Sequence, residues 1–129
     1  MKAVIDACHH VAVVVRDAEE ARAFYGDVLG LERLARPAEL DEKFPGAWYR
    51  IGVAELHVFE RKGTEVDSGP IGPHIALHTS DFDATVQALT ERGCDFAFGP
   101  ARGPDGVARV IVRDPTGNVV EITDAALRA

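Results

Sequence analysis

The sequence predicts an α+β fold made of two tandem βαβββ modules, chiefly because one segment occurs twice. His10-Val-Ala-Val-Val-Val-Arg-Asp17 returns later in the chain as His74-Ile-Ala-Leu-His-Thr-Ser-Asp81. In each copy a histidine opens an apolar run, an aspartate closes it, and an amphipathic stretch that ends at a glycine follows. A repeat of this kind indicates that a half-size unit has been duplicated.

The first copy predicts one strand, one helix and three further strands. Residues 9–16 alternate and are rich in valine, which is typical of a strand. Asp17 and Glu20 have the spacing of a capping box, and apolar side chains at three-and-four spacing predict a helix over residues 18–29. Three shorter strands are expected at 31–36, 47–52 and 54–60.

The second copy follows the same pattern. Asp81 is expected to cap its helix and Gly93 to end it, after a first strand that begins at His74. The three later strands are expected at 95–99, 108–113 and 118–123. We therefore expect a single domain over 1–129, with module one at about 8–62, a Gly- and Pro-rich linker at 63–72 and module two at about 73–124.

Composition limits the classes of partner. The 129 residues carry a formal net charge of −7, which disfavours nucleic acid and anionic membranes, because both attract a basic surface. Asp6 interrupts the N-terminal segment, and the longest apolar run, Val11–Val15, is too short to span a bilayer. We expect a cytoplasmic protein whose partner is a small molecule, and we assign no role to Cys8 or Cys94.

Strand parity gathers chemically active side chains on one face. Successive side chains of a strand point to opposite faces, so His10 and His74 occupy the same face of equivalent strands. In the last strand of the second copy, Glu121 is a lone carboxylate among apolar residues. Such a group must be paired or coordinated when buried, so the alternative to a metal ligand is an ion pair with Arg109 or Arg113.

The matching strand of the first copy offers two candidates. Glu55 and His57 share a face, and we favour His57, because it lies between Leu56 and Val58 as Glu121 lies between two apolar neighbours. Three imidazoles and one carboxylate suit a divalent Zn, Ni, Co, Fe or Mn ion. The predicted metal ligands are His10, His57, His74 and Glu121.

Four segments of the chain resemble the vicinal oxygen chelate superfamily, which includes glyoxalase I, extradiol dioxygenases and bleomycin resistance proteins. The resemblance spans residues 8–124 and implies that paired modules curl into a cup-shaped, eight-stranded mixed sheet, with metal ligands on the first and last strand of each module. It also implies a homodimer. The segments are His-His-Val-Ala-Val-Val-Val-Arg-Asp, Ala-Phe-Tyr-Gly-Asp-Val-Leu-Gly-Leu, Gly-Pro-His-Ile-Ala-Leu and Arg-Asp-Pro-Thr-Gly-Asn-Val-Val-Glu-Ile.

The resemblance implies a metal that holds two neighbouring oxygens of a small substrate. A glyoxalase-like lyase or isomerase would use Glu121 or Glu55 as a base, whereas a dioxygenase would use His10 or His57, with His74 and Glu121, as a facial triad on Fe(II). Glutathione-dependent relatives tend to carry an arginine where this chain has Val14, which argues against glutathione.

Three residues are candidate substrate contacts on the cup-lining strands, namely Trp48, Arg50 and His78. The rival function is a metal-free protein that sequesters a bleomycin-like cationic drug, to which the net charge of −7 is suited. We rank the enzyme first, because sequestration does not require a set of metal ligands.

Overall fold

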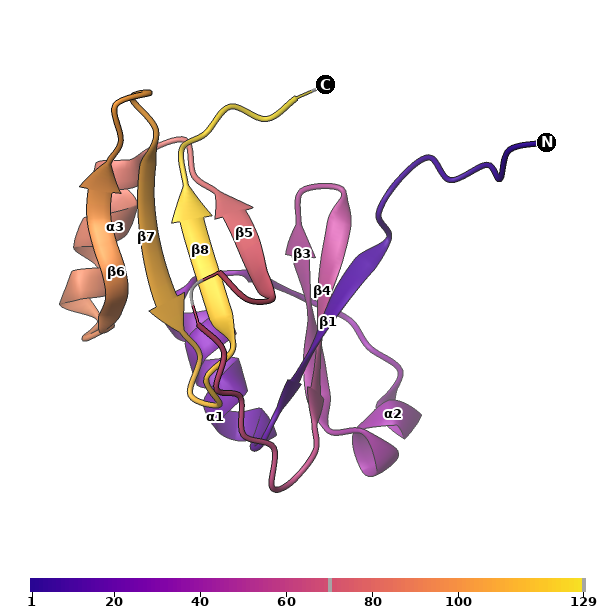
Figure 1. Ribbon diagram of the computed structural model, residues 1–129. Coiled ribbons are helices and arrows are strands. Elements are labelled where there is room, and N and C mark those ends of the chain that lie inside the picture. The colour runs from indigo at the N-terminus through magenta and orange to yellow at the C-terminus, as the bar shows by residue number, and fades with distance from the viewer. Residues whose placement is uncertain (70, 129) are drawn as a thin grey trace.

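The computed structural model describes residues 1–69 and 71–128, so Pro70 of the expected linker and the terminal Ala129 lie outside the described residues. Within those ranges the strands form two four-stranded sheets, ordered β1-β4-β3-β2 and β5-β8-β7-β6. Figure 1 shows the two sheets side by side, with helix α1 below them. The α+β fold of two repeated βαβββ units is thereby confirmed.

Both sheets are mixed and have equivalent connections. The first strand of each module pairs in parallel with the last strand of that module, and the remaining pairs are antiparallel. A parallel pair needs a long crossover, which the intervening helix and strands supply. The first sheet contains β1 (His10–Val15), β2 (Glu32–Leu34), β3 (Gly46–Ile51) and β4 (Ala54–Glu60), and the second contains β5 (His74–His78), β6 (Phe96–Arg102), β7 (Ala108–Arg113) and β8 (Val119–Thr123).

The first helix begins at the predicted residue but has only half of the predicted capping box. α1 spans Ala18–Arg22 and continues as a π-helical segment, Ala23–Val28. Asp17 accepts a hydrogen bond from the backbone N–H of Glu20 at 2.9 Å. The Glu20 carboxylate does not reach back, because it binds the Arg16 guanidinium at 2.7 Å.

A short helix, α2 (Ala38–Lys43), was not predicted from the sequence. It lies between β2 and β3 and has no counterpart between β6 and β7 of the second module. None of its residues is buried, so it lacks the apolar stripe that identifies a core helix. Only the preceding Pro37 and its run of good helix formers could have indicated it.

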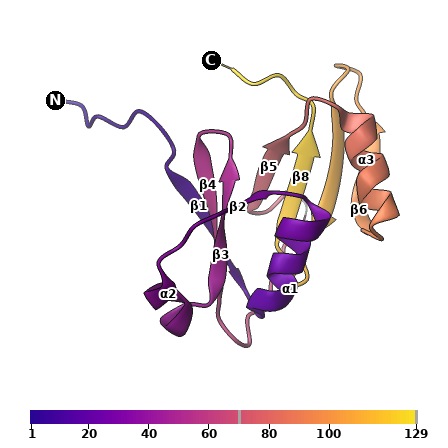
Figure 2. The same cartoon turned by 180° about the vertical axis from the view of Figure 1, so that it is seen from behind.

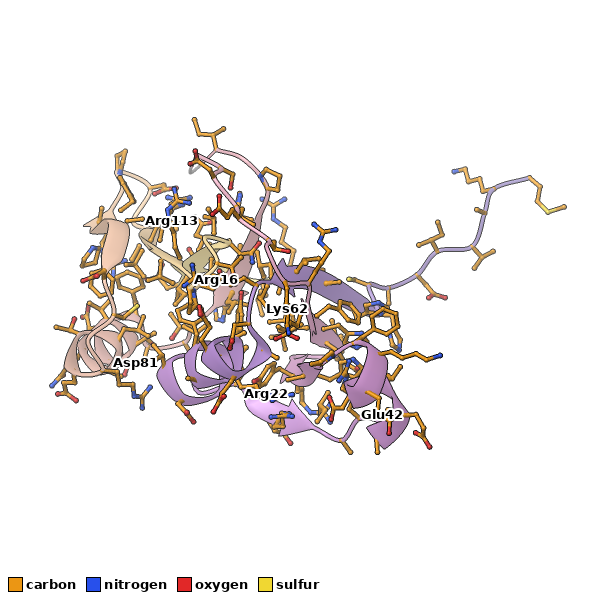
Figure 3. All side chains as sticks on the ribbon, turned by 90° about the horizontal axis from the view of Figure 1, so that it is seen from below. Arg16, Arg22, Glu42, Lys62, Asp81 and Arg113 are labelled. Carbon is orange, nitrogen blue, oxygen red and sulfur yellow. The ribbon has the colours of Figure 1, made fainter. Side chains whose placement is uncertain are left out.

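One apolar core joins the two modules. It takes side chains from both sheets and packs them against α1 and α3 (Phe82–Glu91). In Figure 2, which views the molecule from behind, α1 lies in front of the region where the sheets come together, and Figure 3 labels Arg22 at the end of this helix. Arg22 of α1 donates from Nε and Nη2 to the carbonyl of Gly46, at 3.0 and 2.8 Å. These hydrogen bonds connect the helix to the start of β3.

The buried Asp114 carboxylate holds the turn before β8 and links that turn to the first module. Its side chain accepts the backbone N–H groups of Thr116, Gly117 and Asn118 at 2.8–2.9 Å. The other oxygen, Oδ2, accepts the Tyr25 hydroxyl at 2.8 Å and the Asn118 amide at 2.9 Å. Burial, together with this carboxylate, raises the pKa of Tyr25 well above its ordinary value, so the hydroxyl stays protonated and donates.

Among the described residues, no helix has the length and apolar character that crossing a bilayer requires.

Tyr25→Phe tests the link between the modules that the hydrogen bond from Tyr25 to Asp114 makes. Removing a hydroxyl that donates to a buried carboxylate should lower the free energy of unfolding by about 1–3 kcal/mol, measured by urea denaturation. Tyr49→Phe is the matched control, because Tyr49 is equally buried but its hydroxyl makes no hydrogen bond among the described residues. Equal losses in the two variants would contradict the assigned role of the Tyr25 hydroxyl.

Candidate functional site

Each sheet has one face in the core and an opposite face that carries the predicted ligands. On the first sheet, Leu56 and Val58 are in the core, whereas His57 belongs to the opposite face. On the second sheet, Val120 and Ile122 are in the core and Glu121 belongs to the opposite face. We call the faces that carry the predicted ligands the open faces.

On the first open face, His57 lies between two aromatic rings. Its ring stacks on the His10 ring with centroids 4.0 Å apart and on the Trp48 ring with centroids 4.4 Å apart. The register explains these contacts, because Trp48 is directly opposite His57 and Glu55 is directly opposite His10. The stack leaves His57 only 6% exposed.

The two candidate ligands of the first module form a hydrogen-bonded pair. His57 Nε2 lies 2.9 Å from Glu55 Oε1. A hydrogen bond from His57 is the main reason that the pKa of Glu55 falls below its ordinary value. A carboxylate only accepts, so His57 donates from Nε2 and, in its neutral form, keeps a lone pair on Nδ1. Either residue can therefore bind a metal while the other orients it.

On the second open face, a backbone carbonyl sets the proton position of His74. His74 Nδ1 lies 2.8 Å from the carbonyl oxygen of Gly72. That oxygen cannot donate, so Nδ1 carries the proton and Nε2 of the neutral ring keeps a lone pair. Nε2 lies 3.6 Å from Glu121 Oε2. This is the arrangement in which metal-binding histidines are commonly held.

Glu121 has a second partner, which was the alternative to metal binding. Its Oε1 lies 3.3 Å from Arg109 Nε, and its side chain is 17% exposed. Arg113 instead donates to the carbonyl of Gly117. The Arg109 side chain is 43% exposed, so it has room to move towards solvent, and the ion pair does not exclude a ligand role for Glu121.

The four predicted ligands form two pairs, one on each open face. His10 stacks with His57, and His74 faces Glu121. Within residues 1–69 and 71–128 of a single chain, no group of three or more His, Cys, Asp or Glu side chains is placed to hold a metal ion. Any metal shared by all four ligands needs the two open faces to approach one another.

The residues of each pair suit a divalent metal, with one local adjustment. Imidazole nitrogens and carboxylate oxygens are the donors that Zn, Ni, Co, Fe and Mn accept. The His10 and His57 rings are within 11° of parallel, so their in-plane lone pairs cannot meet at one ion. One of the two rings must rotate if both are ligands.

The predicted substrate contacts have different positions. Trp48 stacks on His57 and belongs to the first open face. Arg50 is exposed and pairs with Glu32 of the neighbouring strand at 3.1 Å. His78 is exposed at the end of β5, on the same face as His74. Only Trp48 directly contacts a predicted ligand.

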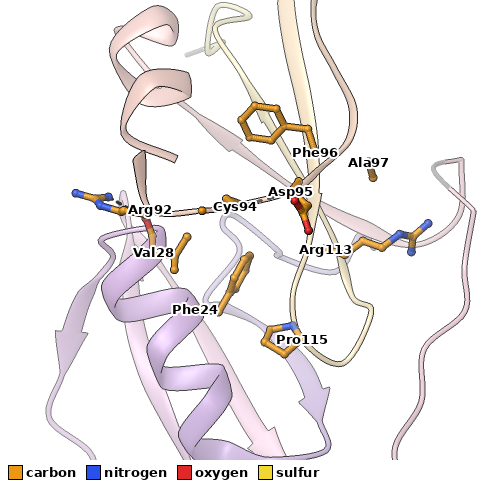
Figure 4. Close-up of a pocket in the computed structure, with 10 residues that line it drawn as sticks. Phe24, Val28, Arg92, Cys94, Asp95, Phe96, Ala97, Arg113 and Pro115 are labelled. Carbon is orange, nitrogen blue, oxygen red and sulfur yellow. Dashed lines mark hydrogen bonds between the residues drawn. The ribbon is translucent and has the colours of Figure 1, made fainter. Parts of the chain in front are cut away.

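A cavity of about 460 Å³ lies elsewhere on the molecule, between α1 and the end of α3. Phe24, Val28 and Cys94 line it, together with Arg92 and Arg113 at its edges (Figure 4). None of the predicted ligands lines it, and we do not assign the site there.

Two equivalent mixed sheets, each with a histidine at the start of its first strand, define a protein built from paired βαβββ modules. The family model for the glyoxalase/bleomycin resistance protein/dioxygenase superfamily matches residues 7–122. The chain therefore belongs to this superfamily.

Solved structures of the same fold support this assignment. A glyoxalase family protein from Bacillus anthracis is 34% identical, with 95% of this chain and 98% of that chain covered and a TM-score of 0.76. A glyoxalase/dioxygenase from Nostoc punctiforme is 27% identical, with 95% of this chain and 97% of that chain covered and a TM-score of 0.75. A lactoylglutathione lyase from Agrobacterium tumefaciens is 25% identical, with 92% of this chain and 93% of that chain covered and a TM-score of 0.68. No curated protein matches the chain.

The proton position of His74 can be tested directly. We expect neutral His74 to carry its proton on Nδ1, because the Gly72 carbonyl oxygen can only accept. Long-range proton–nitrogen NMR of the metal-free protein distinguishes the two tautomers. His78 serves as the reference, since it has no hydrogen-bond partner among the described residues and should populate both forms. A proton on Nε2 of His74 would contradict the geometry.

Proposed function

We propose that the protein is a metal-dependent enzyme of glyoxalase type that acts on a small molecule with two neighbouring oxygens. The observation that carries this proposal is the His74–Glu121 pair, with Nδ1 of the histidine tied to a carbonyl and Nε2 left beside the carboxylate. A purely structural histidine does not need this arrangement. The repeat provides a second pair of suitable residues on the equivalent face of the first sheet.

We infer that the complete site forms between two copies of the chain. The first open face of one protomer would supply His10 and His57, and the second open face of its partner would supply the equivalents of His74 and Glu121. Two considerations support this inference. The four ligands do not converge among the described residues of one chain, and a twofold dimer of this kind would form two identical sites.

The bound metal would hold the two substrate oxygens and stabilise the negative charge that develops on them. The side chains of the chain position and move the proton. The Glu121 carboxylate is the proposed base, which would take a proton from the carbon beside a carbonyl and return it to the former carbonyl carbon, so that the substrate is isomerised. Arg109 contacts Oε1 of Glu121 and so orients the carboxylate.

The number of ligands favours glyoxalase-type chemistry over oxygen insertion. If His10, His57, His74 and Glu121 all held the metal, they would leave about two positions, which suffices for a pair of vicinal oxygens. A dioxygenase keeps only three protein ligands and needs a further open position for oxygen. Glutathione is not the proposed co-substrate, although one similar structure is a lactoylglutathione lyase, because Val14 occupies the position where an arginine is expected.

Substitution of His74 tests the metal site. His74→Ala should abolish stoichiometric metal binding with little change in the melting temperature, because the side chain is partly exposed and leaves no core cavity. Metal content is measured by plasma mass spectrometry on untagged protein dialysed against Zn, Ni, Co, Fe and Mn. His78→Ala, on the same strand and face, is the control and should keep the metal.

His57→Ala and Glu55→Ala, measured side by side, identify the ligand of the first module. The variant that no longer binds metal identifies the residue that is the ligand. The other variant should still bind metal, but with an affinity lower by about 10–100-fold, because the residue that orients the ligand is missing. Unchanged metal content in His74→Ala would contradict the site. Absence of metal from the wild type under all these conditions would instead favour the drug-sequestering protein.

Mixed dimers test whether the site forms between chains. One variant carries His10→Ala and His57→Ala, the other carries His74→Ala and Glu121→Ala, and neither should bind metal alone. After the two are unfolded and refolded together, random pairing should restore about a quarter of the wild-type metal, because half of the dimers are mixed and each has one intact site. No recovery in the mixture would place all the ligands within one chain.

A further inference from the structure

A large apolar cavity lies on the first open face, next to the predicted ligands. Its volume is about 740 Å³, within the range of pockets that enclose small molecules. The apolar side chains that line it come from β1, α2, β3 and β4, and they are Val14, Leu40, Phe44, Trp48 and Phe59. The cavity adjoins the candidate metal ligands, because the ring of Trp48 stacks on the ring of His57.

The helix α2 forms one wall of this cavity and is fixed in place by Arg36. The Arg36 side chain is 4% exposed, pairs with Asp41 and donates to the carbonyl of Phe44. Its guanidinium carbon lies 6.0 Å from the centroid of the Trp48 ring. The wall is therefore held at the C-terminal half of α2, although the helix itself buries no residue in the core.

Two buried donors beneath this wall have no acceptor. Arg36 Nε and the indole N–H of Trp48 make no hydrogen bond in the described structure. Trp48 lines the cavity, and the Arg36 guanidinium lies over the Trp48 ring. Buried donors are nearly always paired in folded proteins, so this neighbouring pair indicates a place where an acceptor atom is missing. An oxygen-bearing ligand could supply such an acceptor after a small shift of these side chains.

Two of the three charged side chains at the rim of the cavity are cationic, in contrast to the net charge of −7 for the chain. Lys43, Glu60 and Arg61 line it. Glu60 is already engaged, because it accepts the backbone N–H of Ala18 at the start of α1 at 3.1 Å. Lys43 has no carboxylate partner among the described residues, and Arg61 donates from Nε to the neutral Thr64 hydroxyl at 3.3 Å. These two cations suit an anionic group.

We propose that this cavity is the substrate-binding pocket and that it selects a molecule with an apolar, ring-sized body and a carboxylate. The body lies against Phe44 and Phe59, and the carboxylate binds to Lys43 and Arg61 at the rim. This inference rests on the proposed function, because it assigns to the same site the part of the substrate that does not react. The short α2, absent from the second module, becomes the element that determines specificity.

Binding to the metal-free protein tests the pocket independently of catalysis. The probes are 3-phenylpropanoate, 3-phenylpropan-1-ol and 3-phenylpropylamine, which share one body and differ in charge. Trp48 is the only tryptophan of the chain, so the fluorescence signal comes from a residue that lines this cavity and stacks on His57, and the absence of metal removes one other source of change. The carboxylate should bind at least tenfold more tightly than the alcohol, and the amine should bind most weakly.

Two sets of variants assign the contacts. Phe44→Ala should raise the Kd of the carboxylate at least tenfold. Phe98→Ala on β6 of the other sheet is the matched control, because the two rings are similarly exposed, at 51% and 50%, and it should leave the Kd unchanged. Lys43→Gln with Arg61→Gln should remove the preference for the carboxylate over the alcohol.

Equal affinities for the three probes, or no binding of any of them, would overturn the proposal. A Phe44→Ala variant that changes the oligomeric state while none of the probes binds the wild type would also overturn it, since the cavity would then seat a second copy. The outcome is separable from that of the metal site. If the protein binds 3-phenylpropanoate but never binds metal, the pocket is supported and the proposed metalloenzyme is refuted. If it binds metal but not 3-phenylpropanoate, only the pocket is refuted.

Discussion

The fold depends on one buried carboxylate that connects its two halves. Asp114 gathers three backbone N–H groups of the turn before β8, so that a charged group only 3% exposed is fully hydrogen-bonded. Through Tyr25 the same carboxylate binds the π-helical segment that follows α1. Through Asn118, which donates to the Val14 carbonyl at 2.9 Å, the turn is also joined to β1. The relative position of the open faces is therefore set in the core, by contacts far from the candidate ligands.

Much of the fold could be predicted because the repeat and the strand period are strong signals. The alternation in β1 and β4 correctly separated the core residues from the face that carries His10 and His57. The strands at 54–60 and 108–113 were predicted with correct ends, since turn residues precede each. The helix at 18–29 was predicted in extent, but its change to π-helical pairing after Arg22 has no signal in side-chain spacing.

The site was less predictable, because its geometry depends on contacts between strands. The sequence raised Glu55 and His57 as alternatives, but not that they would form one hydrogen-bonded pair. Arg109 and Arg113 were both considered for Glu121, and the strand register places them symmetrically, opposite Thr123 and Val119. Only Arg109 pairs with Glu121, because Arg113 turns to the Gly117 carbonyl of the neighbouring loop. The hydrogen bond from His74 to the Gly72 carbonyl depends on a loop conformation that no side-chain pattern predicts. Whether His57 or Glu55 binds metal remains a prediction.

The helix α2 breaks the symmetry of an otherwise duplicated molecule. The two modules present equivalent open faces, but only the first has a wall beside it, and that wall is a six-residue helix with no residue in the core. Its sequence can therefore change with little effect on folding, whereas the strands that bear the candidate ligands also carry core residues on their other face. Such a division of labour lets a lineage acquire new substrates by replacing one surface segment while the reacting centre stays constant.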